Sequence, residues 1–197
     1  TLNTVGAQGE PGNFISQVLG PPTPRTATLL ATAGVKYVVF NAWAYRSLEQ
    51  TPPRYAPEGY EVAKRTSDGE AVWRVTAPPA DGFVTFHGMD TQRLEYTGSG
   101  WRNWRWMFTE GFVRAYVEEP GTYRATFRAA PAGRSQVVTA TSPDGFTSSI
   151  TVNRQADYAL TIKVPERGAK ITLEARPGAG PNIPTVQFTP WLLERVS

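Results

Sequence analysis

The second half of the chain alternates between apolar and polar residues in short runs bounded by turn residues. Segment 122–129 shows the pattern most clearly, because tyrosine, alanine and phenylalanine alternate there with threonine and arginine. A side-chain period of two is typical of an antiparallel strand with one buried face. The alternation therefore predicts a strand at 122–129 and further strands of the same kind on both sides of it.

Ten such runs follow a proline- and glycine-rich segment at 78–82. We expect strands at 83–87, 93–96, 104–108, 112–118, 122–129, 136–141, 147–152, 158–164, 170–175 and 185–191. Glycine- and proline-containing turns separate several of them. Short strands at regular spacing with such turns favour a mainly β fold, either an antiparallel β-sandwich or a jelly roll.

The first eighty residues predict a small α/β subdomain instead. A threonine followed by proline at 23–24 marks a helix start, and we expect the helix at 25–33 with Gly34 as its left-handed end. The apolar run 35–40 is expected to be a strand buried on both faces. Segments 60–65 and 70–75 alternate around a turn and predict a hairpin. We place the boundary so that 1–80 form the subdomain and 81–197 the sandwich.

Composition excludes several function classes. The net charge is only +3, so the clustered basic face of a nucleic-acid-binding protein is not expected. The chain has no cysteine, which excludes disulfides and thiolate metal sites. No apolar run approaches the ~20 residues that cross a bilayer. The opening Thr-Leu-Asn-Thr indicates a fragment of a longer protein, in which a membrane anchor would lie elsewhere.

Aromatic and arginine residues gather at 101–108, where three of the six tryptophans lie. At strand spacing Trp104, Trp106 and Phe108 share one face, while Arg105 and the following methionine share the other. Exposed tryptophan rings stack on the C–H faces of sugars, and arginine can hydrogen-bond their hydroxyl groups. The alternative is that the three aromatic residues are core and Arg105 is a solvated outer residue.

Two residues that follow a Gly-Ser-Gly loop, Trp101 and Arg102, are the better candidates for exposure, and binding and structural roles are equally open for them. The only histidine, His87, ends a predicted strand and is either a structural residue or part of a cleft with Asp90 and Glu95. We take Trp101, Arg102, Trp104, Arg105, Trp106, Glu95, His87 and Asp90 as the candidate carbohydrate-binding residues.

Catalysis and metal binding have weaker support. Glycoside hydrolysis needs two carboxyl groups about 5–10 Å apart, and several acids of this chain could meet that condition. We therefore keep a hydrolase on a β-sandwich as an alternative and expect no catalytic residue in this chain. No cofactor is expected. A structural calcium ion near Asp144 or Asp157 stays open, although no ligand motif supports it.

Three short motifs together resemble one bacterial family. They are the helix, glycine and strand at 29–39 (LLATAGVKYVV), the hairpin strand at 71–75 (AVWRV), and the WRW motif at 104–106 with Glu95 shortly before it. This pattern, spread over most of 26–175, is similar to the C-terminal domains that follow the last membrane span in glycosyltransferases that use lipid-linked sugars. The residues at 101–103 depart from that pattern.

The resemblance implies an extracytoplasmic domain, periplasmic or at the cell surface, tethered to the membrane in the full-length protein. Its partners would be a glycan and the membrane-embedded remainder of the same polypeptide. The catalytic acids of the family lie in the membrane part, so none is assigned here. We thus expect a carbohydrate-binding-module-like sandwich that binds or positions sugar. The rival hypotheses are a structural or protein-interaction cap without a ligand and the hydrolase above.

Overall fold

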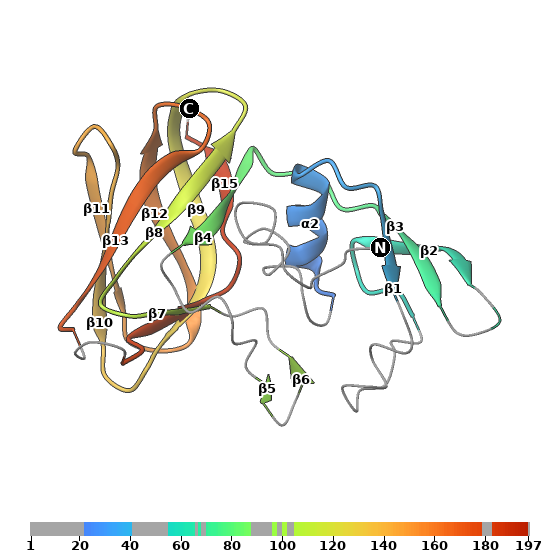
Figure 1. The fold of residues 1–197 in the computed structure, drawn as a ribbon, viewed down its shortest axis with the longest axis horizontal. Coiled ribbons are helices and arrows are strands. Elements are labelled where there is room, and N and C mark those ends of the chain that lie inside the picture. The colour runs from blue at the N-terminus through green and yellow to red at the C-terminus, as the bar shows by residue number, and fades with distance from the viewer. Residues whose placement is uncertain are drawn as a thin grey trace.

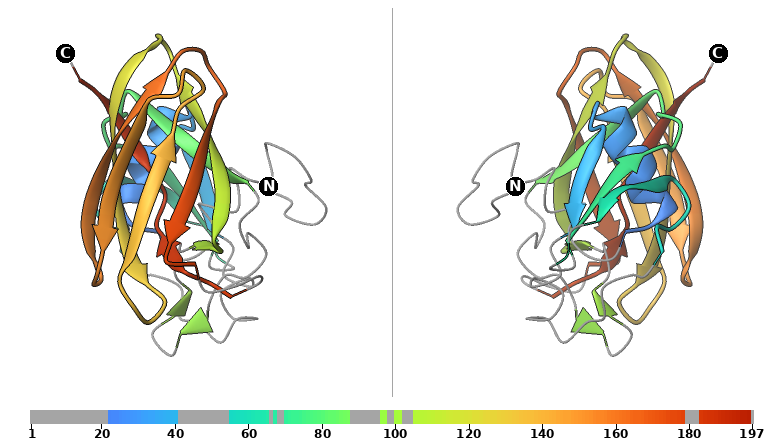
Figure 2. Two further views of the ribbon diagram at one scale, coloured as in Figure 1. Left: turned by 90° about the vertical axis from the view of Figure 1, so that its left-hand side faces the viewer. Right: turned by 90° about the vertical axis from the view of Figure 1, so that its right-hand side faces the viewer.

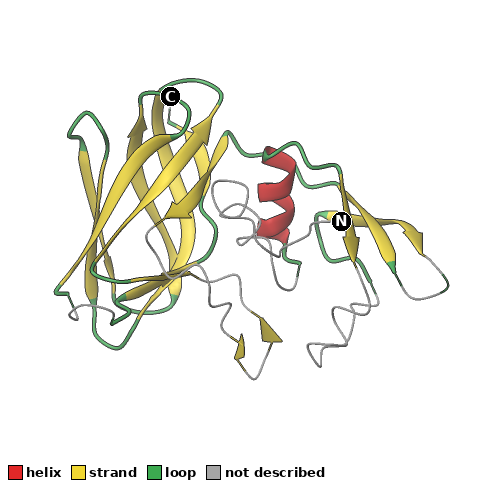
Figure 3. Cartoon of the chain, in the orientation of Figure 1, coloured by secondary structure: helices red, strands yellow, loops and turns green. Residues whose placement is uncertain are grey.

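The computed structural model describes residues 22–40, 55–65, 67, 70–87, 96–97, 100–101, 105–178 and 183–196. For residues 40, 96–97, 100–101 and 105 only the backbone is described. These parts form a mainly β, antiparallel structure, as the sequence predicts (Figure 3). Figure 1 shows helix α2 between the large β-sandwich and a small three-stranded sheet. The domain boundary near residue 80 stays a prediction.

Helix α2 (Pro24–Thr32) confirms the predicted helix to within one residue. Thr23 and Thr26 form a capping box, in which each side-chain hydroxyl accepts the other residue's backbone N–H. At the other end, Gly34 has a φ of 76° and donates to the carbonyl of Ala31. Because only glycine adopts this left-handed conformation without strain, the helix ends where the sequence predicts.

The small sheet has the order β1-β3-β2 and contains β1 (Tyr37–Phe40), β2 (Tyr60–Arg65) and β3 (Ala71–Val75). The predicted hairpin is confirmed as β2 and β3. The prediction that the first strand is buried on both faces is wrong. β1 lies at the sheet edge, where Tyr37 and Val39 are each 57% exposed, while Val38 packs against the core of Tyr60 and Trp73.

Two layers of strands form the sandwich, as the end-on views show (Figure 2). The first layer has the order β11-β10-β13-β8-β4 and the second contains β12, β9, β14 and β7. Their bounds are β4 (Gly82–His87), β7 (Arg105–Met107), β8 (Glu110–Val117), β9 (Gly121–Pro131), β10 (Gln136–Thr141), β11 (Thr147–Val152), β12 (Ala156–Val164), β13 (Ala169–Arg176) and β14 (Val186–Phe188). A separate ladder joins β5 (Tyr96–Thr97) to β6 (Gly100–Trp101).

Strand β15 (Leu192–Arg195) belongs to both layers, because it pairs with β4 on one side and with β9 on the other. The sequence predicts one strand at 185–191 here, and this prediction is wrong. The chain breaks between β14 and β15 at Thr189, Pro190 and Trp191. Proline has no N–H to donate to a ladder, so the chain leaves the sheet at Pro190 and resumes pairing at Leu192.

The remaining predictions for the sandwich strands largely hold. The strands at 136–141 and 147–152 have the predicted bounds, and most others differ by one or two residues at an end. Most of the predicted strand 93–96 lies outside the described residues. The alternation predicts these strands well because one face of each strand is buried between the layers. Apolar and polar residues therefore alternate along the sequence with a period of two.

An aromatic cluster fills the space between the two layers. The Trp191 ring is stacked on Phe127 of β9, with ring centroids 4.2 Å apart and an interplanar angle of 11°. Phe188 and Phe86 meet Trp191 edge-on. All four side chains are fully buried. Since Phe86 comes from the first layer and Phe127 and Phe188 from the second, this cluster joins the two sheets.

Hydroxyl groups close the side of the sandwich opposite β15. The backbone N–H of Thr161 in β12 donates to the Oγ of Ser148 in β11, at 3.2 Å. Lys163 donates in the same way to Ser142, which follows β10. These N–H groups of β12 point away from its partner β9 and would otherwise have only solvent to bond. The two serines therefore link the free edge of β12 to the first layer.

Candidate functional site

Four of the candidate sugar-binding residues, Asp90, Glu95, Arg102 and Trp104, lie outside the described residues. Trp101 and Arg105 are described by their backbone alone, in β6 and β7. Their proposed roles therefore stay predictions. Of the predicted set, only His87 and Trp106 have described side chains.

Strand β7 shows which of its two faces points inward. Met107 is fully buried, whereas Trp106 and Phe108 are partly exposed on the opposite face. The cause is the register with β14, in which Met107 lies opposite the buried Val186. Trp106 and Phe108 are thus only partly buried, and a sugar-binding role for Trp106 stays a prediction.

His87 lies at the end of β4 on the outer face of the first layer. Its Nε2 shares a 3.0 Å hydrogen bond with the hydroxyl of Thr85, and its ring stacks on Phe112 of β8 with centroids 4.9 Å apart. Lys170 of β13 places its Nζ 4.5 Å from the centroid of the same Phe112 ring. Among the described residues, His87 is not part of any group of three potential metal ligands.

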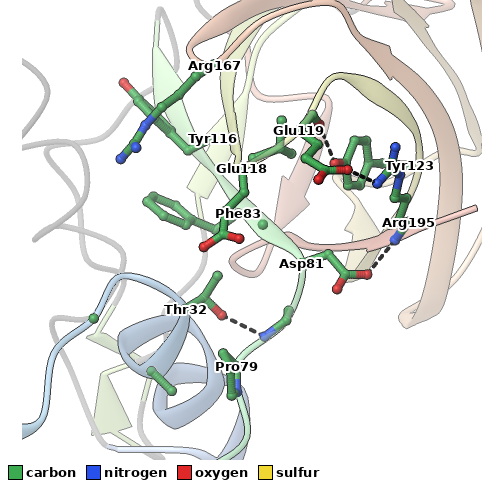
Figure 4. Close-up of a pocket in the computed structure, with 15 residues that line it drawn as sticks. Thr32, Pro79, Asp81, Phe83, Tyr116, Glu118, Glu119, Tyr123, Arg167 and Arg195 are labelled. Atoms are coloured by element: carbon green, nitrogen blue, oxygen red, sulfur yellow. Dashed lines mark hydrogen bonds and ion pairs between the residues drawn. The ribbon is translucent and has the colours of Figure 1, made fainter.

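A pocket that the sequence did not predict lies between the subdomain and the sandwich (Figure 4). It has a volume of about 640 Å³. The end of α2 and the connecting segment form one side, and strands β4 and β8 with the loop after β12 form the other. The lining residues are Ala31, Thr32, Gly34, Pro79, Ala80, Asp81, Gly82, Phe83, Tyr116, Val117, Glu118, Glu119, Tyr123, Arg167 and Arg195. We call it the junction pocket.

Two aromatic rings form the apolar part of the junction pocket. Phe83 and Tyr116 lie directly opposite each other in the register of β4 and β8. Their rings are stacked, with centroids 5.2 Å apart and an interplanar angle of 19°. Gly82 allows this close strand approach, since a Cβ there would lie 2.5 Å from the carbonyl oxygen of Tyr116. Both rings are partly exposed, so the pair offers an apolar surface to the pocket.

Arg195 holds two of the acidic groups in place. Its guanidinium is ion-paired with Glu119, and its backbone N–H donates to Asp81 Oδ2 at 2.7 Å. Tyr123 donates its hydroxyl to the Glu119 carbonyl oxygen at 2.5 Å, and burial raises the pKa of that hydroxyl. These contacts order one wall of the junction pocket.

Glu118 and Arg167 also line the junction pocket, and their surroundings differ from those of Asp81 and Glu119. Both side chains are exposed, and neither makes a hydrogen bond or ion pair within the described part of the chain. In Figure 4 the Phe83 ring lies between the Glu118 carboxylate and the Arg167 guanidinium. The pocket therefore offers an aromatic pair with a hydrogen-bond acceptor on one side and a donor on the other.

The subdomain is held against the sandwich near this pocket. Arg25 of α2 donates from Nη1 to the carbonyl oxygens of Thr126 in β9, at 2.8 Å, and Pro190, at 3.1 Å. Burial lowers the pKa of its guanidinium, and the charges of Asp157 and Glu194 oppose that shift. On the pocket side, the backbone N–H of Ala80 donates to the Thr32 hydroxyl at 2.9 Å. Arg25 thus ties α2 to the sandwich, and the Ala80–Thr32 bond joins the two elements that form one side of the junction pocket.

The two aspartates considered as calcium ligands, Asp144 and Asp157, interact with basic side chains in this structure. Asp144 accepts the backbone N–H of Phe146 at 3.0 Å and lies 3.5 Å from Lys163 Nζ. The Phe146 N–H, followed by the Lys163 charge, lowers the pKa of Asp144. Asp157 contributes to the charge around Arg25. No group of three His, Cys, Asp or Glu side chains that could hold a metal ion occurs in the described ranges.

No helix in the described part of the chain is long and apolar enough to cross a membrane. Sequence comparison adds no family: no protein-family model matches the chain, and no curated protein matches it.

Several solved structures resemble the chain at low similarity. A β-(1,4)-mannanase of Podospora anserina has a TM-score of 0.40 and 14% identity, over 59% of this chain and 26% of that one. The carbohydrate-binding module of Cellvibrio mixtus lichenase 5A, solved with cellotriose, has a TM-score of 0.32 and 11% identity, over 71% and 89%. The cycloalternan-forming enzyme of Listeria monocytogenes has a TM-score of 0.38 and 10% identity, over 81% and 17%.

The chain thus spans about a quarter of the mannanase and less than a fifth of the cycloalternan-forming enzyme. TM-scores below 0.5 do not carry an argument about function.

Proposed function

We propose that this chain is a carbohydrate-binding accessory domain whose binding site is the junction pocket. The observation that carries the proposal is the stacked Phe83–Tyr116 pair, accompanied in the same pocket by Glu118 and Arg167, which have no ionic or hydrogen-bond partner among the described residues. The pocket volume of about 640 Å³ is within the range of ~300–1,000 Å³ that is common for small-molecule sites.

Sugar recognition requires both kinds of surface found here. The C–H groups on one side of a pyranose are apolar and pack on an aromatic ring, while the hydroxyl groups around its edge need hydrogen-bond partners. A carboxylate accepts and a guanidinium donates, and bonds to charged groups are stronger than those between neutral groups. An aromatic platform contributes about 1 kcal/mol beyond its buried area, so we expect millimolar to micromolar affinity.

The hydrogen bonds and ion pairs of the acidic side chains favour binding over hydrolysis. Retaining and inverting glycosidases need two carboxyl groups that act on one glycosidic bond. In the junction pocket Glu119 is ion-paired with Arg195, and Asp81 accepts the Arg195 N–H. Glu118 is the one acid lining this pocket that has no such contact in the described residues. One free carboxylate supports a hydrogen-bonding role.

We also propose that the parent protein is a membrane glycosyltransferase or a related membrane protein. The motifs at 29–39, 71–75 and 104–106 resemble the C-terminal domains of membrane glycosyltransferases that use lipid-linked sugars. On that resemblance the chain would act outside the cytoplasm, tethered to a membrane-embedded remainder, and would position a glycan for it. A chain whose junction pocket, in the described residues, offers one acid free of ion pairs and hydrogen bonds suits an accessory role.

A glycan-array screen tests the binding proposal. The wild-type chain is compared with a Phe83→Ala, Tyr116→Ala double variant, with folding checked by circular dichroism. The matched control is Phe146→Ala, which removes a half-buried ring outside the pocket. We expect the wild type and the control to bind the same glycans and the double variant to lose at least about ten-fold in affinity. Absence of binding by the wild type would favour the structural cap.

The tryptophan cluster provides a rival site for the same function. A Trp101→Ala, Arg102→Ala double variant belongs in the same screen. Loss of binding in this variant, with binding intact after removal of Phe83 and Tyr116, would move the site from the junction pocket to the segment around residues 101–106. If both variants still bound glycans, neither the junction pocket nor the segment around residues 101–106 would be the binding site.

A further inference from the structure

The charged residues that line the junction pocket determine which class of sugar it can bind. We propose, on the basis of the proposed function, that the pocket binds uncharged saccharide units and rejects saccharides that carry carboxylate, phosphate or sulfate groups.

Carboxylates outnumber guanidinium groups in the lining. Asp81, Glu118 and Glu119 are acidic, while Arg167 and Arg195 are basic. Arg195 is already engaged by Glu119 through an ion pair and by Asp81 through its backbone N–H. An anionic ligand therefore meets a net negative lining in which a single guanidinium, that of Arg167, is available to pair with it.

The end of helix α2 adds to this bias. Ala31, Thr32 and Gly34 line the junction pocket, so the C-terminal end of the helix faces it. The aligned peptide dipoles of a helix place a partial negative charge at that end. The C-terminal end of α2 thus disfavours binding of an anion in the junction pocket. It does not disfavour a neutral hydroxyl group in the same way.

Glu118 is the residue that makes the rejection specific. Its side chain lines the junction pocket together with Phe83, on which a sugar would stack (Figure 4). A carboxylate accepts hydrogen bonds and cannot donate them, so it suits the hydroxyl groups of a neutral sugar. A uronate carboxylate in that position would face a like charge and lose its water without gaining a donor. An unpaired charge of this kind lowers the affinity for the wrong ligand.

The experiment uses matched pairs of probes. Cellohexaose, mannohexaose and maltohexaose are each titrated beside the hexauronate obtained by oxidising their primary hydroxyl groups, so that the two members differ only at C6, where a carboxylate replaces the hydroxymethyl group. The proteins are the wild-type chain, Glu118→Gln and Glu174→Gln. Glu174 is on β13 outside the pocket and pairs with Arg176, so its variant changes the net charge equally without touching the site.

We expect at least one neutral hexasaccharide to bind the wild type about ten-fold or more tightly than its uronate. Glu118→Gln should reduce that ratio, and Glu174→Gln should leave it unchanged. Because exposed charges are screened by salt, the ratio should also fall between 50 mM and 500 mM sodium chloride.

Equal or tighter binding of the uronates by the wild type would overturn the inference while leaving sugar binding intact. A ratio that Glu174→Gln alters as much as Glu118→Gln would also overturn it, because the effect would then be one of net charge. Failure of all six probes to bind would reject the proposed function itself, and the inference with it.

Discussion

The backbone N–H of Lys163 donates a 2.9 Å hydrogen bond to the side-chain oxygen of Ser142, across the open side of the sandwich. Lys163 is in β12, whose ladder partner is β9 in the second layer, and Ser142 follows β10 in the first. Ser142 is buried, with 3% of its surface exposed. A hydroxyl group thus replaces the missing strand at this edge and protects it from pairing with another chain.

Replacement of Ser142 by alanine should destabilise the chain by about 1–3 kcal/mol, because it leaves a partly buried backbone N–H without an acceptor. Urea unfolding followed by tryptophan fluorescence measures the change. Ser149→Ala is the matched control, since the Ser149 hydroxyl shares an exposed hydrogen bond with Thr139. We expect the control to stay within about 0.5 kcal/mol of the wild type. Equal effects of the two variants would contradict the role assigned to Ser142.

Removal of the Arg25 side chain should loosen the subdomain from the sandwich. Arg25→Ala leaves the carbonyl groups of Thr126 and Pro190 without their donor and should cost about 1–3 kcal/mol. Proteolysis in the connecting segment 76–81 should accelerate at the same time. Arg74→Ala serves as the control, because the Arg74–Glu61 ion pair is more than half exposed on both sides and such pairs contribute about 0–1 kcal/mol. Unchanged proteolysis in Arg25→Ala would rule out the anchoring role.

Stability should fall at alkaline pH because of Tyr60. Burial raises the pKa of its hydroxyl above the ordinary value of 10.0, and the hydrogen bond with Thr26 opposes the shift. A raised pKa in the folded state means that this contribution is full below pH 10 and is lost as the pH rises through the folded value. Tyr60→Phe should therefore show a shallower decline in stability between pH 9 and 12 than the wild type.

The size of that difference is read from urea midpoints at each pH. Tyr55→Phe is the control, since the Tyr55 side chain is 84% exposed. Burial also raises the pKa of Tyr123, so part of the decline should persist in Tyr60→Phe. Identical pH profiles for the wild type and Tyr60→Phe would show that the Tyr60 hydroxyl is not linked to folding.

Trp191 should be the most sensitive position of the aromatic cluster. Its ring is fully buried between Phe86, Phe127 and Phe188, so Trp191→Ala should cost about 3–5 kcal/mol. Trp191→Phe should cost clearly less, because the indole Nε1 is buried and has no hydrogen-bond partner in the described residues. Phenylalanine removes that unsatisfied donor while it keeps an aromatic ring. Chemical unfolding of both variants measures the order, and a larger loss in Trp191→Phe would contradict it.

The sequence predicts the elements of this fold well where each signal is local. The Thr23 cap, Gly34 and the alternation in β9 to β13 depend on neighbouring residues, and those predictions hold. Placement of the first strand fails, because an apolar run has the same appearance at the centre and at the edge of a sheet. The sequence also leaves open which face of β7 points inward. Its three residues are too few to fix the inward side, which the pairing of Met107 with Val186 decides.

The junction pocket could not be predicted because its residues meet only through tertiary contacts. Phe83 and Tyr116 are brought together by the register of β4 and β8, and Arg167 comes from a turn far along the chain. The partner that engages Asp81 and Glu119 is Arg195 in β15, and no local pattern indicates it.

The double pairing of β15 has a consequence for the order in which the protein is made. Strand β4 is synthesised more than a hundred residues before β15, and β9 also leaves the ribosome well ahead of it. Until 192–195 emerge, both strands present an unpaired edge that faces the position of β15. A nascent chain that stalls before Leu192 therefore keeps two adhesive strand edges open, and it is at this stage of translation that a chaperone would be needed most.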